Sequence, residues 1–378
     1  MRPAFGGGVA APARKALRPM TLQDSKLPQA GAAGAVPTGK SGGPARVCVV
    51  GGAGYVGSVL VRTLLARGYG VTVLDNFLYD HALSVEGIYD EPGYRLVNGD
   101  LRRADVVAQA LEGVDHVVLL ASLVGDPISK KYPELTRSVN LDGSQALFAA
   151  LDTHDIDRFV FTSTCSNYGL MDDNTLADET SSLNPLSLYA ETKVGFEQFV
   201  LGQLDSHKVC PTLLRIATAF GMSQRMRFDL TVNEFGRAMA MKTPLDVYDK
   251  DTWRPYAHVR DISGAIIKVL ESDSAKVKGE VFNVGSDENN YTKAMLVEEF
   301  LRHVDAPVAF VEKGADARNY RVSFAKIRNQ LGFEAQHSVA DFVPQLISAV
   351  QDGLYGRADT LKTYYGNYQV RDGVPDTL

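Results

Sequence analysis

From residue 46 onward, short apolar runs alternate with segments in which apolar residues recur every three or four positions. The short runs are typical of strands buried inside a sheet, and the recurring pattern predicts amphipathic helices. The runs read RVCVV, VTVLD, YRLVNGD, HVVLL and RFVFTST, and the helical segments are 56–67, 104–112, 133–151 and 190–204. Because strand and helix alternate, we expect an α/β fold with a doubly wound parallel sheet. Such a sheet binds its ligand at the carboxyl ends of its strands.

The first 44 residues differ from the rest of the chain. They are rich in Gly and Pro and carry almost no large apolar side chains, which favours a flexible tail over residues 1–44. Several Arg and Lys residues with Asp24 as the only acid also fit a transit peptide, but the Gly and Pro content disfavours the amphipathic helix that such a peptide forms. We therefore expect the folded part to begin near residue 45.

Composition and charge narrow the class of protein. The chain has 378 residues, is 45% hydrophobic and carries a net charge of -6, so no general attraction to nucleic acid or to an anionic membrane is expected. No apolar stretch reaches the roughly 18 residues needed to span a bilayer. Cys48, Cys165 and Cys210 lie far apart without a CxxC pair, which argues against a disulfide framework or a metal site and fits a reducing cytoplasm.

A glycine-rich turn follows the first predicted strand. Residues 52–57, GAGYVG, form a GxGxxG pattern that opens a helix, where the backbone can approach a pyrophosphate. A glycine turn that merely packs is the alternative. However, Asp75 ends the next strand, where a carboxylate binds the adenosine ribose and repels a 2′-phosphate, so NAD is expected rather than NADP. Asp100 and Leu101, after the third strand, are expected beside the adenine.

A second group of residues suggests catalysis. The fifth strand ends in Thr162, Ser163 and Thr164, and Tyr189 and Lys193 follow four positions apart on a predicted helix, hence on one face. The alternative to a catalytic role is that Tyr189 and Lys193 are an exposed pair of side chains on the helix surface. Because these residues follow a nucleotide-binding half, we interpret Tyr189 as the acid/base of a hydride-transfer reaction. The Lys193 ammonium and a positively charged nicotinamide are expected to lower the pKa of Tyr189. Thr164 is expected to orient the substrate oxygen.

With these motifs, and with RPYAHVRD and FNVGS further on, residues 46–354 resemble the extended short-chain dehydrogenase/reductase family, specifically nucleotide-sugar epimerases and dehydratases of the UDP-glucose 4-epimerase type. The resemblance implies a Rossmann sheet with a smaller α/β C-terminal substrate domain, a Thr164/Tyr189/Lys193 catalytic triad and a tightly held NAD. The implied domains are an NAD-binding domain over 45–217 and a mainly substrate-binding domain over 218–378, with part of 255–285 returning to the first sheet.

The resemblance also implies which residues contact the two ligands. The NAD contacts are expected from Gly51, Gly54, Tyr55, Val56, Gly57, Asp75, Asn76, Asp100, Leu101, Ala121, Ser122, Asn140, Thr162 and Ile216. The contacts to a nucleotide-diphosphate sugar are expected from Asp126, Ser166, Thr218, Arg227, Asn233, Arg254, Asp316 and Arg318. Residues 222–230 are expected to cross the base and phosphates of the substrate. Arg225 is the alternative to Arg227 as a ligand there, and either arginine can instead be solvated.

The positions after Thr164 bear on the reaction. Related 4,6-dehydratases have an Asp-Glu pair there, and this chain has Cys165 and Ser166, so a carboxylic acid for water elimination is missing. We therefore expect an NAD-dependent epimerase, acting at C4, with no metal. A dehydratase or ketoreductase and a non-catalytic dinucleotide sensor remain alternatives, as does a nucleophilic role for Cys165. In the resembling family, the helices over 133–151 and 190–204 pair into a four-helix interface, which implies a homodimer.

Overall fold

A seven-stranded parallel sheet forms the centre of the fold. The computed structural model describes residues 37–172, 175–312 and 318–377. The strand order is β3-β2-β1-β4-β5-β7-β11, and every neighbouring pair is parallel. Its strands are β1 (Arg46–Val50), β2 (Gly70–Asp75), β3 (Tyr94–Asn98), β4 (His116–Leu119), β5 (Arg158–Thr164), β7 (Cys210–Ile216) and β11 (Glu280–Val284). The order reverses direction between β1 and β4, so a crevice is expected at the carboxyl ends of these strands.

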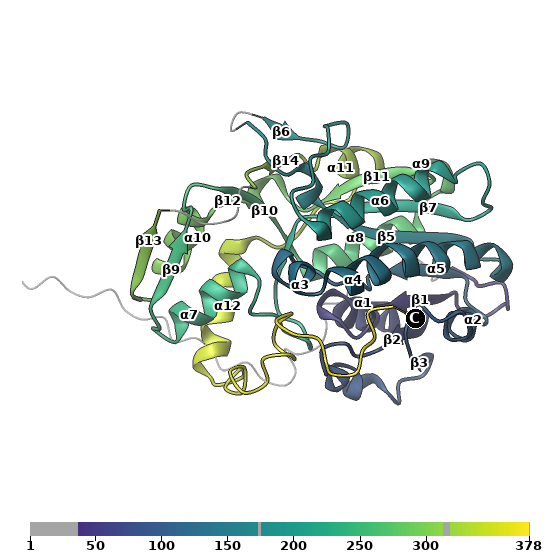
Figure 1. Cartoon of the computed structure of the whole chain (residues 1–378), viewed down its shortest axis with the longest axis horizontal. Helices are drawn as coiled ribbons and strands as arrows, with labels where there is room; N and C mark the ends of the chain where they lie inside the picture. The colour runs from purple at the N-terminus through teal and green to yellow at the C-terminus, as the bar shows by residue number, and fades with distance from the viewer. Residues whose placement is uncertain (1–36, 173–174, 313–317, 378) are drawn as a thin grey trace, which may run out of the picture. The chain divides into compact units, whose positions relative to one another are not determined.

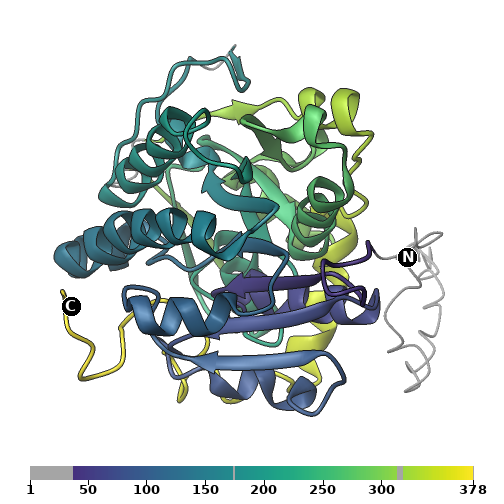
Figure 2. The ribbon, with the colours of Figure 1, turned by 90° about the vertical axis from the view of Figure 1, so that its right-hand side faces the viewer.

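Both faces of this sheet are covered by helices, which confirms the predicted α/β Rossmann fold (Figures 1 and 2). Along β1, Val47 and Val49 belong to one apolar core, whereas Cys48 and Val50 belong to the other. Successive side chains of a strand point to opposite faces, so a run without polar positions is buried on both sides. The first core includes residues of α1 (Tyr55–Ala66), α8 (Val259–Glu271), α9 (Ser274–Val277) and α11 (Ala325–Leu331). The second includes residues of α2 (Ala104–Leu111), α3 (Asp126–Lys131), α4 (Pro133–Arg137), α5 (Ser144–Ala150) and α6 (Leu188–Gly202).

The helix predicted over 133–151 contains a π-helical turn. This turn, η2 (Ser138–Gly143), joins α4 to α5. Within it, the Asn140 amide accepts a hydrogen bond from the Leu123 N–H and donates one to the Leu123 carbonyl. The turn therefore fixes the backbone that follows β4. Four short 3₁₀ segments complete the helices: η1 (Ala82–Ile88), η3 (Leu151–His154), η4 (Cys165–Tyr168) and η5 (Asp287–Asn289).

Residues after β7, together with the short strand β6 that precedes it, build a second region, most of it around a third apolar core. Its helices are α7 (Thr231–Ala240), α10 (Lys293–Leu301) and α12 (Val339–Gln351). Its short strands are β6 (Leu176–Ala177), β8 (Thr218–Phe220), β9 (Leu245–Tyr248), β10 (Trp253–His258), β12 (Asn290–Thr292), β13 (Val308–Val311) and β14 (Arg321–Val322). Within this part of the chain, α8 packs on α1 and β11 pairs with β7, so α8 and β11 belong to the Rossmann part of the fold.

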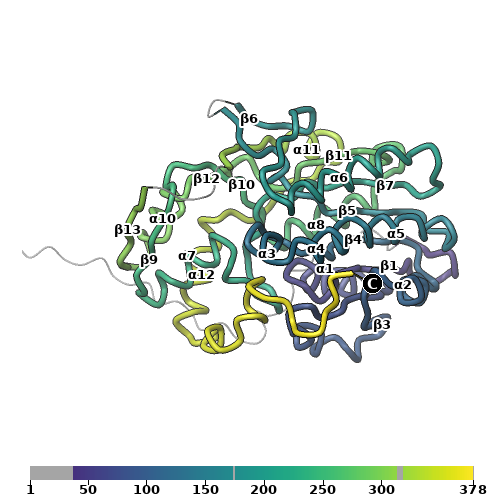
Figure 3. The backbone as a smooth tube through the Cα atoms, in the orientation of Figure 1, coloured from purple at the N-terminus to yellow at the C-terminus, as the bar shows by residue number. Residues whose placement is uncertain are grey.

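The two ends of the described chain lie against the Rossmann sheet. Residues 37–44, assigned above to the tail, form a turn in which the Lys40 N–H donates to Asp115, and residues 1–36 lie outside the described residues. After α12, the chain returns across the molecule, and the Arg371 N–H donates to the Leu78 carbonyl (Figure 3). We call residues 361–377 the C-terminal segment. Over the described ranges, no helix is both long and apolar enough to cross a bilayer.

Candidate active site

The turn between β1 and α1 requires glycine at two positions. Gly51 has a φ of +86°, and a Cβ there would lie 2.6 Å from the backbone nitrogen of Ala121. A Cβ on Gly57 would lie 2.3 Å from the carbonyl oxygen of Gly51. Gly54 is the N-cap of α1 and provides no side-chain cap, so the first N–H groups of the helix are left for another acceptor. This arrangement suits an anion at the positive end of the helix.

Asp75 is held as a carboxylate beside this turn. Its Oδ2 accepts the Ala53 N–H at 3.0 Å, and its Oδ1 accepts the Phe77 N–H at 2.9 Å. His81 Nε2 lies 3.3 Å from Oδ1. Burial acts to raise the pKa of Asp75, but His81 and the two backbone donors outweigh it and lower that pKa. The side chain is therefore ionised at neutral pH and repels a second negative charge.

A cavity opens over the glycine turn, and we call it the glycine-turn cavity. Most of the predicted NAD contacts line it: Gly51, Gly54, Tyr55, Gly57, Asp75, Asn76, Asp100, Leu101, Ala121 and Ser122. The Ser122 Oγ is buried and has no hydrogen-bond partner among the described residues, so it is available to a ligand. Asn140 does not line the cavity. Its amide is hydrogen-bonded to the backbone of Leu123, which follows the cavity residue Ser122, and so fixes that part of the chain.

A second cavity, of about 580 Å³, contains the predicted catalytic residues, and we call it the tyrosine cavity. Thr164 reaches it from the end of β5, and Tyr189 and Lys193 reach it from α6. The helix starts at its N-cap Ser187, whose Oγ accepts the Ala190 N–H, so Tyr189 and Lys193 fall in the first two turns. Lys193 Nζ donates to the Thr162 carbonyl at 2.9 Å. Val56, Thr162 and Ile216 also line this cavity.

Burial perturbs both titratable residues of the triad. It raises the pKa of Tyr189, while Thr164 and the positive charge of Arg227 act in the opposite direction. Burial lowers the pKa of Lys193 to about 7, and only Glu197 opposes this. Such shifted acids and bases, gathered on one cavity, are typical of catalytic sites.

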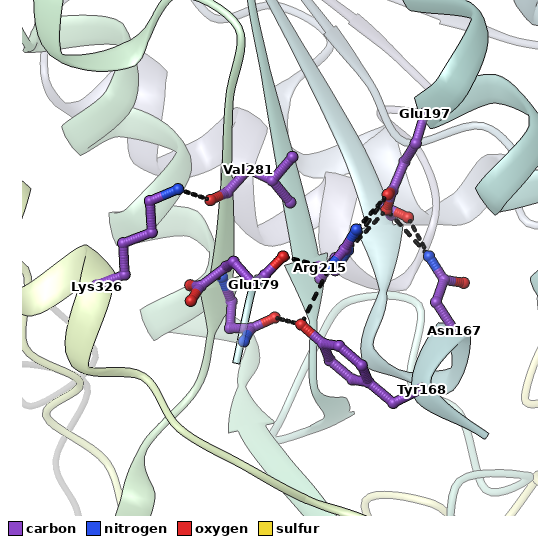
Figure 4. A network of polar contacts seen from close by, with 9 residues as sticks. Asn167, Tyr168, Glu179, Glu197, Arg215, Val281 and Lys326 are labelled. Atoms are coloured by element: carbon purple, nitrogen blue, oxygen red, sulfur yellow. Dashed lines mark hydrogen bonds and ion pairs between the residues drawn. The ribbon is translucent and has the colours of Figure 1, made fainter. Parts of the chain in front are cut away.

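A buried polar network lies behind the triad (Figure 4). Arg215 Nη2 on β7 pairs with Glu197 Oε2 on α6 at 2.8 Å, and Asn167 Nδ2 donates to Glu197 Oε1 at 3.0 Å. Arg215 Nη1 also donates to the hydroxyl of Tyr168. Glu197 is one helical turn beyond Lys193, and Asn167 is three residues after Thr164. The network therefore fixes α6, which carries Tyr189 and Lys193, relative to the end of β5.

The predicted substrate contacts also gather on the tyrosine cavity, with two exceptions. Asp126, Ser166, Thr218, Arg227, Arg254 and Arg318 line it. Arg318 forms an ion pair with Asp126 at 3.1 Å. Asn233 is buried away from both cavities, and its Nδ2 donates to the Tyr55 hydroxyl and the Arg227 carbonyl. Asp316 and the neighbouring Lys313 lie outside the described residues. Arg225 and Arg227 are both buried, so the solvated alternative is wrong for these two arginines.

Cys165 has the environment of a packing residue. Its thiol is buried and donates to the Arg215 carbonyl, and burial raises its pKa. A thiol that stays protonated is a poor nucleophile, so the structure favours the packing role over the nucleophilic alternative. All three cysteines are buried and free, and no cluster of His, Cys, Asp and Glu in the described ranges is arranged to hold a metal ion.

Several residues that line the two cavities are not among those predicted from the sequence. Tyr79, His81 and Asn367 line the glycine-turn cavity, and Tyr320 and Tyr368 line the tyrosine cavity. The first two follow Asp75 closely, so the loop after β2 was a usable signal. Asn367 and Tyr368 belong to the C-terminal segment, whose return to the cavities has no local sequence pattern.

Comparisons with known proteins identify the family. The model described as the NAD dependent epimerase/dehydratase family matches residues 47–285. The chain belongs to this family. A low-salt glycan biosynthesis protein of Haloferax volcanii, Agl12, is 32% identical over 305 residues, which cover 78% of this chain and 95% of that protein. A UDP-glucose 4-epimerase of Corynebacterium glutamicum is 28% identical over 315 residues, which cover 78% of this chain and 92% of that enzyme.

The solved structures include a dehydratase. The dTDP-glucose 4,6-dehydratase DesIV of Streptomyces venezuelae, solved with NAD bound, has a TM-score of 0.74 and 26% identity. The match covers 84% of this chain and 99% of that one. This NAD dependent epimerase/dehydratase family member therefore shares its fold with enzymes of both reaction types, and the similarity does not separate epimerase from dehydratase.

NAD is the cofactor of this family, and the residues of the glycine-turn cavity fit it. Gly51 and Gly57 leave room for a backbone approach that a Cβ would block, and α1 presents its uncapped N-terminus. Asp75 is an ionised acceptor for ribose hydroxyls, and the Ser122 Oγ is a polar atom without a protein partner in the described ranges. When bound, NAD supplies a hydride acceptor that can also return the hydride.

Proposed function

We propose that the chain interconverts nucleotide-diphosphate sugars that differ in configuration at C4, through a transient keto intermediate. The proposal is supported by the meeting of Thr164, Tyr189 and Lys193 on one cavity with a cofactor cavity next to it. Tyr55, Leu120, Val124, Arg227 and Asn367 line both cavities, so the two adjoin. A sugar in the tyrosine cavity can thus reach the nicotinamide end of a dinucleotide that starts at the glycine turn.

The two positions after Thr164 carry the choice of epimerase over dehydratase. Cys165 is buried, and its thiol is held by a main-chain carbonyl. The Ser166 hydroxyl faces the tyrosine cavity and lies 3.2 Å from the Tyr320 hydroxyl. Neither side chain has a carboxylic acid that could protonate a leaving hydroxyl or remove a proton from C5. Epimerisation requires no such group.

In the proposed reaction, the protein residues control one proton. The Tyr189 oxygen takes the proton of the C4 hydroxyl as that carbon is oxidised, and returns it when the carbon is reduced on its other face. The Thr164 hydroxyl orients the sugar oxygen. The Thr164 hydrogen bond and the charge of Arg227 oppose the effect of burial on the pKa of Tyr189. A protonated Lys193 and the positive charge of an oxidised nicotinamide ring would add to this effect and favour the phenolate.

The second region is proposed to hold the nucleotide diphosphate. Arg227 and Arg254 are both buried and line the tyrosine cavity, and Arg318 lines it at a more exposed position. Guanidinium groups bind phosphate oxygens through two donors at once, which fixes the position of the ligand. In this proposal, residues 45–217 bind NAD and most of 218–378 binds the substrate.

A dehydratase is the second candidate, because one carboxylate faces the catalytic residues. Asp126 lines the tyrosine cavity, its Oδ1 is buried without a hydrogen-bond partner among the described residues, and its charge acts to raise the pKa of Tyr189. Its other oxygen pairs with Arg318 at 3.1 Å. Water elimination needs both an acid and a base, and Asp126 is a single carboxylate already paired with Arg318, so we rank this candidate second.

Product mass tests the proposal. Purified protein is incubated with a panel of UDP-, dTDP- and GDP-sugars, and the products are read by mass spectrometry and NMR. We expect a product of unchanged mass with inverted C4, and a product lighter by one water would contradict the proposal. Tyr189→Phe is the matched control: it removes only the hydroxyl, so turnover is expected to fall by about 10² or more while NAD stays bound.

We also propose that the chain works as a cytoplasmic homodimer through α4, α5 and α6. These helices lie side by side on one face of the sheet (Figure 1), and Leu141 and Phe199 are apolar residues there that are only partly buried. Burying such positions against a second copy would form a four-helix interface. Light scattering should give a mass near twice the 41.0 kDa of one chain, and a mass of one chain would contradict the dimer.

A further inference from the structure

A buried arginine, Arg225, lines the glycine-turn cavity and forms no ion pair with any described carboxylate. Arg225 is 2% exposed, and its Nη2 donates to the carbonyl oxygens of Thr363 and Gly366 in the C-terminal segment. Its Nε is buried and has no acceptor in the described parts of the chain. The guanidinium also lies over the Tyr79 ring, 4.8 Å from its centroid, and the charges of Asp229 and Asp75 act on it without forming an ion pair. A buried guanidinium with an unused donor and no paired carboxylate favours the binding of an anionic ligand.

The other basic residues of this cavity are already engaged. Among the described residues that line it, these are His81, which contacts Asp75, and Arg227, which forms an ion pair with Asp229. No described carboxylate forms an ion pair with Arg225. Burial and the neighbouring charge of Arg227 lower the pKa of Arg225 to about 10, although the charges of Asp229 and Asp75 act in the opposite direction, so the side chain stays cationic at neutral pH.

The loop that carries Arg225 is tied to the first turn of α1. Ser223 Oγ donates to the Tyr55 carbonyl at 2.7 Å and lies 2.9 Å from Ser58 Oγ. The Tyr55 hydroxyl donates in turn to the Gly221 carbonyl at 2.6 Å. Arg225 is two residues beyond Ser223, so its backbone is held next to the N-terminus of the helix. In a dinucleotide-binding turn, that end of the helix is the place of the pyrophosphate.

We propose that Arg225 binds the pyrophosphate of NAD and supplies the counter-charge that the glycine turn alone does not. The sequence alone suggests Arg225 only as a contact to the substrate. Because Thr363 and Gly366 hold the same guanidinium, Arg225 also joins the C-terminal segment to the cofactor. The proposal concerns NAD binding, which epimerases and dehydratases share, so its outcome is independent of the reaction proposed above.

Binding measurements on Arg225→Met test this inference. Calorimetry and thermal shift compare NAD with adenosine, which has the adenine and ribose but no phosphate. We expect the Kd for NAD to rise about 10- to 100-fold, as for loss of a hydrogen bond to a charged group, and the Kd for adenosine to stay within about twofold. The NAD(H) that copurifies with the variant should fall accordingly.

Two further variants make the result decisive. Arg95→Met is the matched control, because Arg95 also donates to two main-chain carbonyls and does not line the cavity; it should leave the NAD affinity unchanged. Arg225→Lys keeps the charge and should keep most of the NAD affinity. Arg225→Gln removes the charge but keeps a hydrogen-bond donor, and it replaces the Met variant, with the same expected loss, if that one does not fold. An unchanged NAD affinity in Arg225→Met, or equal losses for NAD and adenosine, would overturn the proposal.

Discussion

At the scale of single residues, the site depends on a few buried charges whose environments set their roles. Asp75 accepts two backbone N–H groups and contacts His81, and these contacts lower its pKa despite burial. Lys193 has a single neighbouring acid, Glu197, and burial lowers its pKa to about 7. Asp75 is thus kept ionised, as an acceptor for ribose hydroxyls requires, whereas Lys193 is close to losing its proton at neutral pH.

Asp75 should decide the choice between the two dinucleotides. Replacing it with Ala removes both the acceptor for the ribose hydroxyls and the charge that repels a 2′-phosphate. We expect Asp75→Ala to weaken NAD binding and to narrow the preference for NAD over NADP by about tenfold or more, measured as the ratio of the two Kd values. Native protein that copurifies mainly with NADP would refute this assignment.

The lowered pKa of Lys193 predicts a pH dependence of stability. The pKa of Lys193 is about 7 in the folded chain and ordinarily 10.5. At a pH between these two values, the folded chain binds fewer protons at this side chain than the unfolded chain does. The free energy of unfolding should therefore rise with pH across that window. In Lys193→Met this contribution is absent, so the stability of wild type relative to the variant should increase from pH 7 toward pH 10. A difference that is flat with pH, at matched NAD content, would count against a perturbed Lys193.

At the scale of elements, α6 connects catalysis to the core. Tyr189, Lys193 and Glu197 follow at spacings of four and share one face of this helix. The first two face the tyrosine cavity, and Glu197 is held by Arg215 on β7 and by Asn167 after β5. The position of the helix relative to the sheet, and with it the approach of Tyr189 to Thr164, thus depends on one buried ion pair.

Breaking this pair should be costly. Glu197→Gln leaves the Arg215 guanidinium buried without a counter-charge, and loss of one partner of a buried ion pair costs about 3–5 kcal/mol of unfolding free energy. Denaturant unfolding measures the effect. The matched control is the double variant Glu197→Gln with Arg215→Met, which we expect to lose less than the sum of the two single variants. A loss below about 1 kcal/mol in the single variant would mean that the pair does not hold α6.

At the scale of the whole molecule, the sequence predicts those features of the fold and the site that depend on a local pattern. The glycine turn, Asp75 and the Tyr189–Lys193 spacing each combine a short motif with a strand or helix end, and the structure brings them to two adjoining cavities. The amides of Asn140 and Asn233, which are predicted to contact ligands, bind the Leu123 backbone and the Tyr55 hydroxyl in the structure, and these contacts depend on packing. Segments distant in sequence bring Arg225 and Asn367 together at one cavity, which no local pattern shows.

The central claim is that C4 is oxidised and then reduced again without loss of water. The most direct measurement uses a nucleotide sugar carrying deuterium at C4 and follows the label and the product mass by NMR and mass spectrometry. The epimerase account predicts a product of unchanged mass, inverted at C4, with the deuterium still on C4 and no solvent hydrogen at C5. A product that has lost one water, or that carries the label on another carbon, would contradict it.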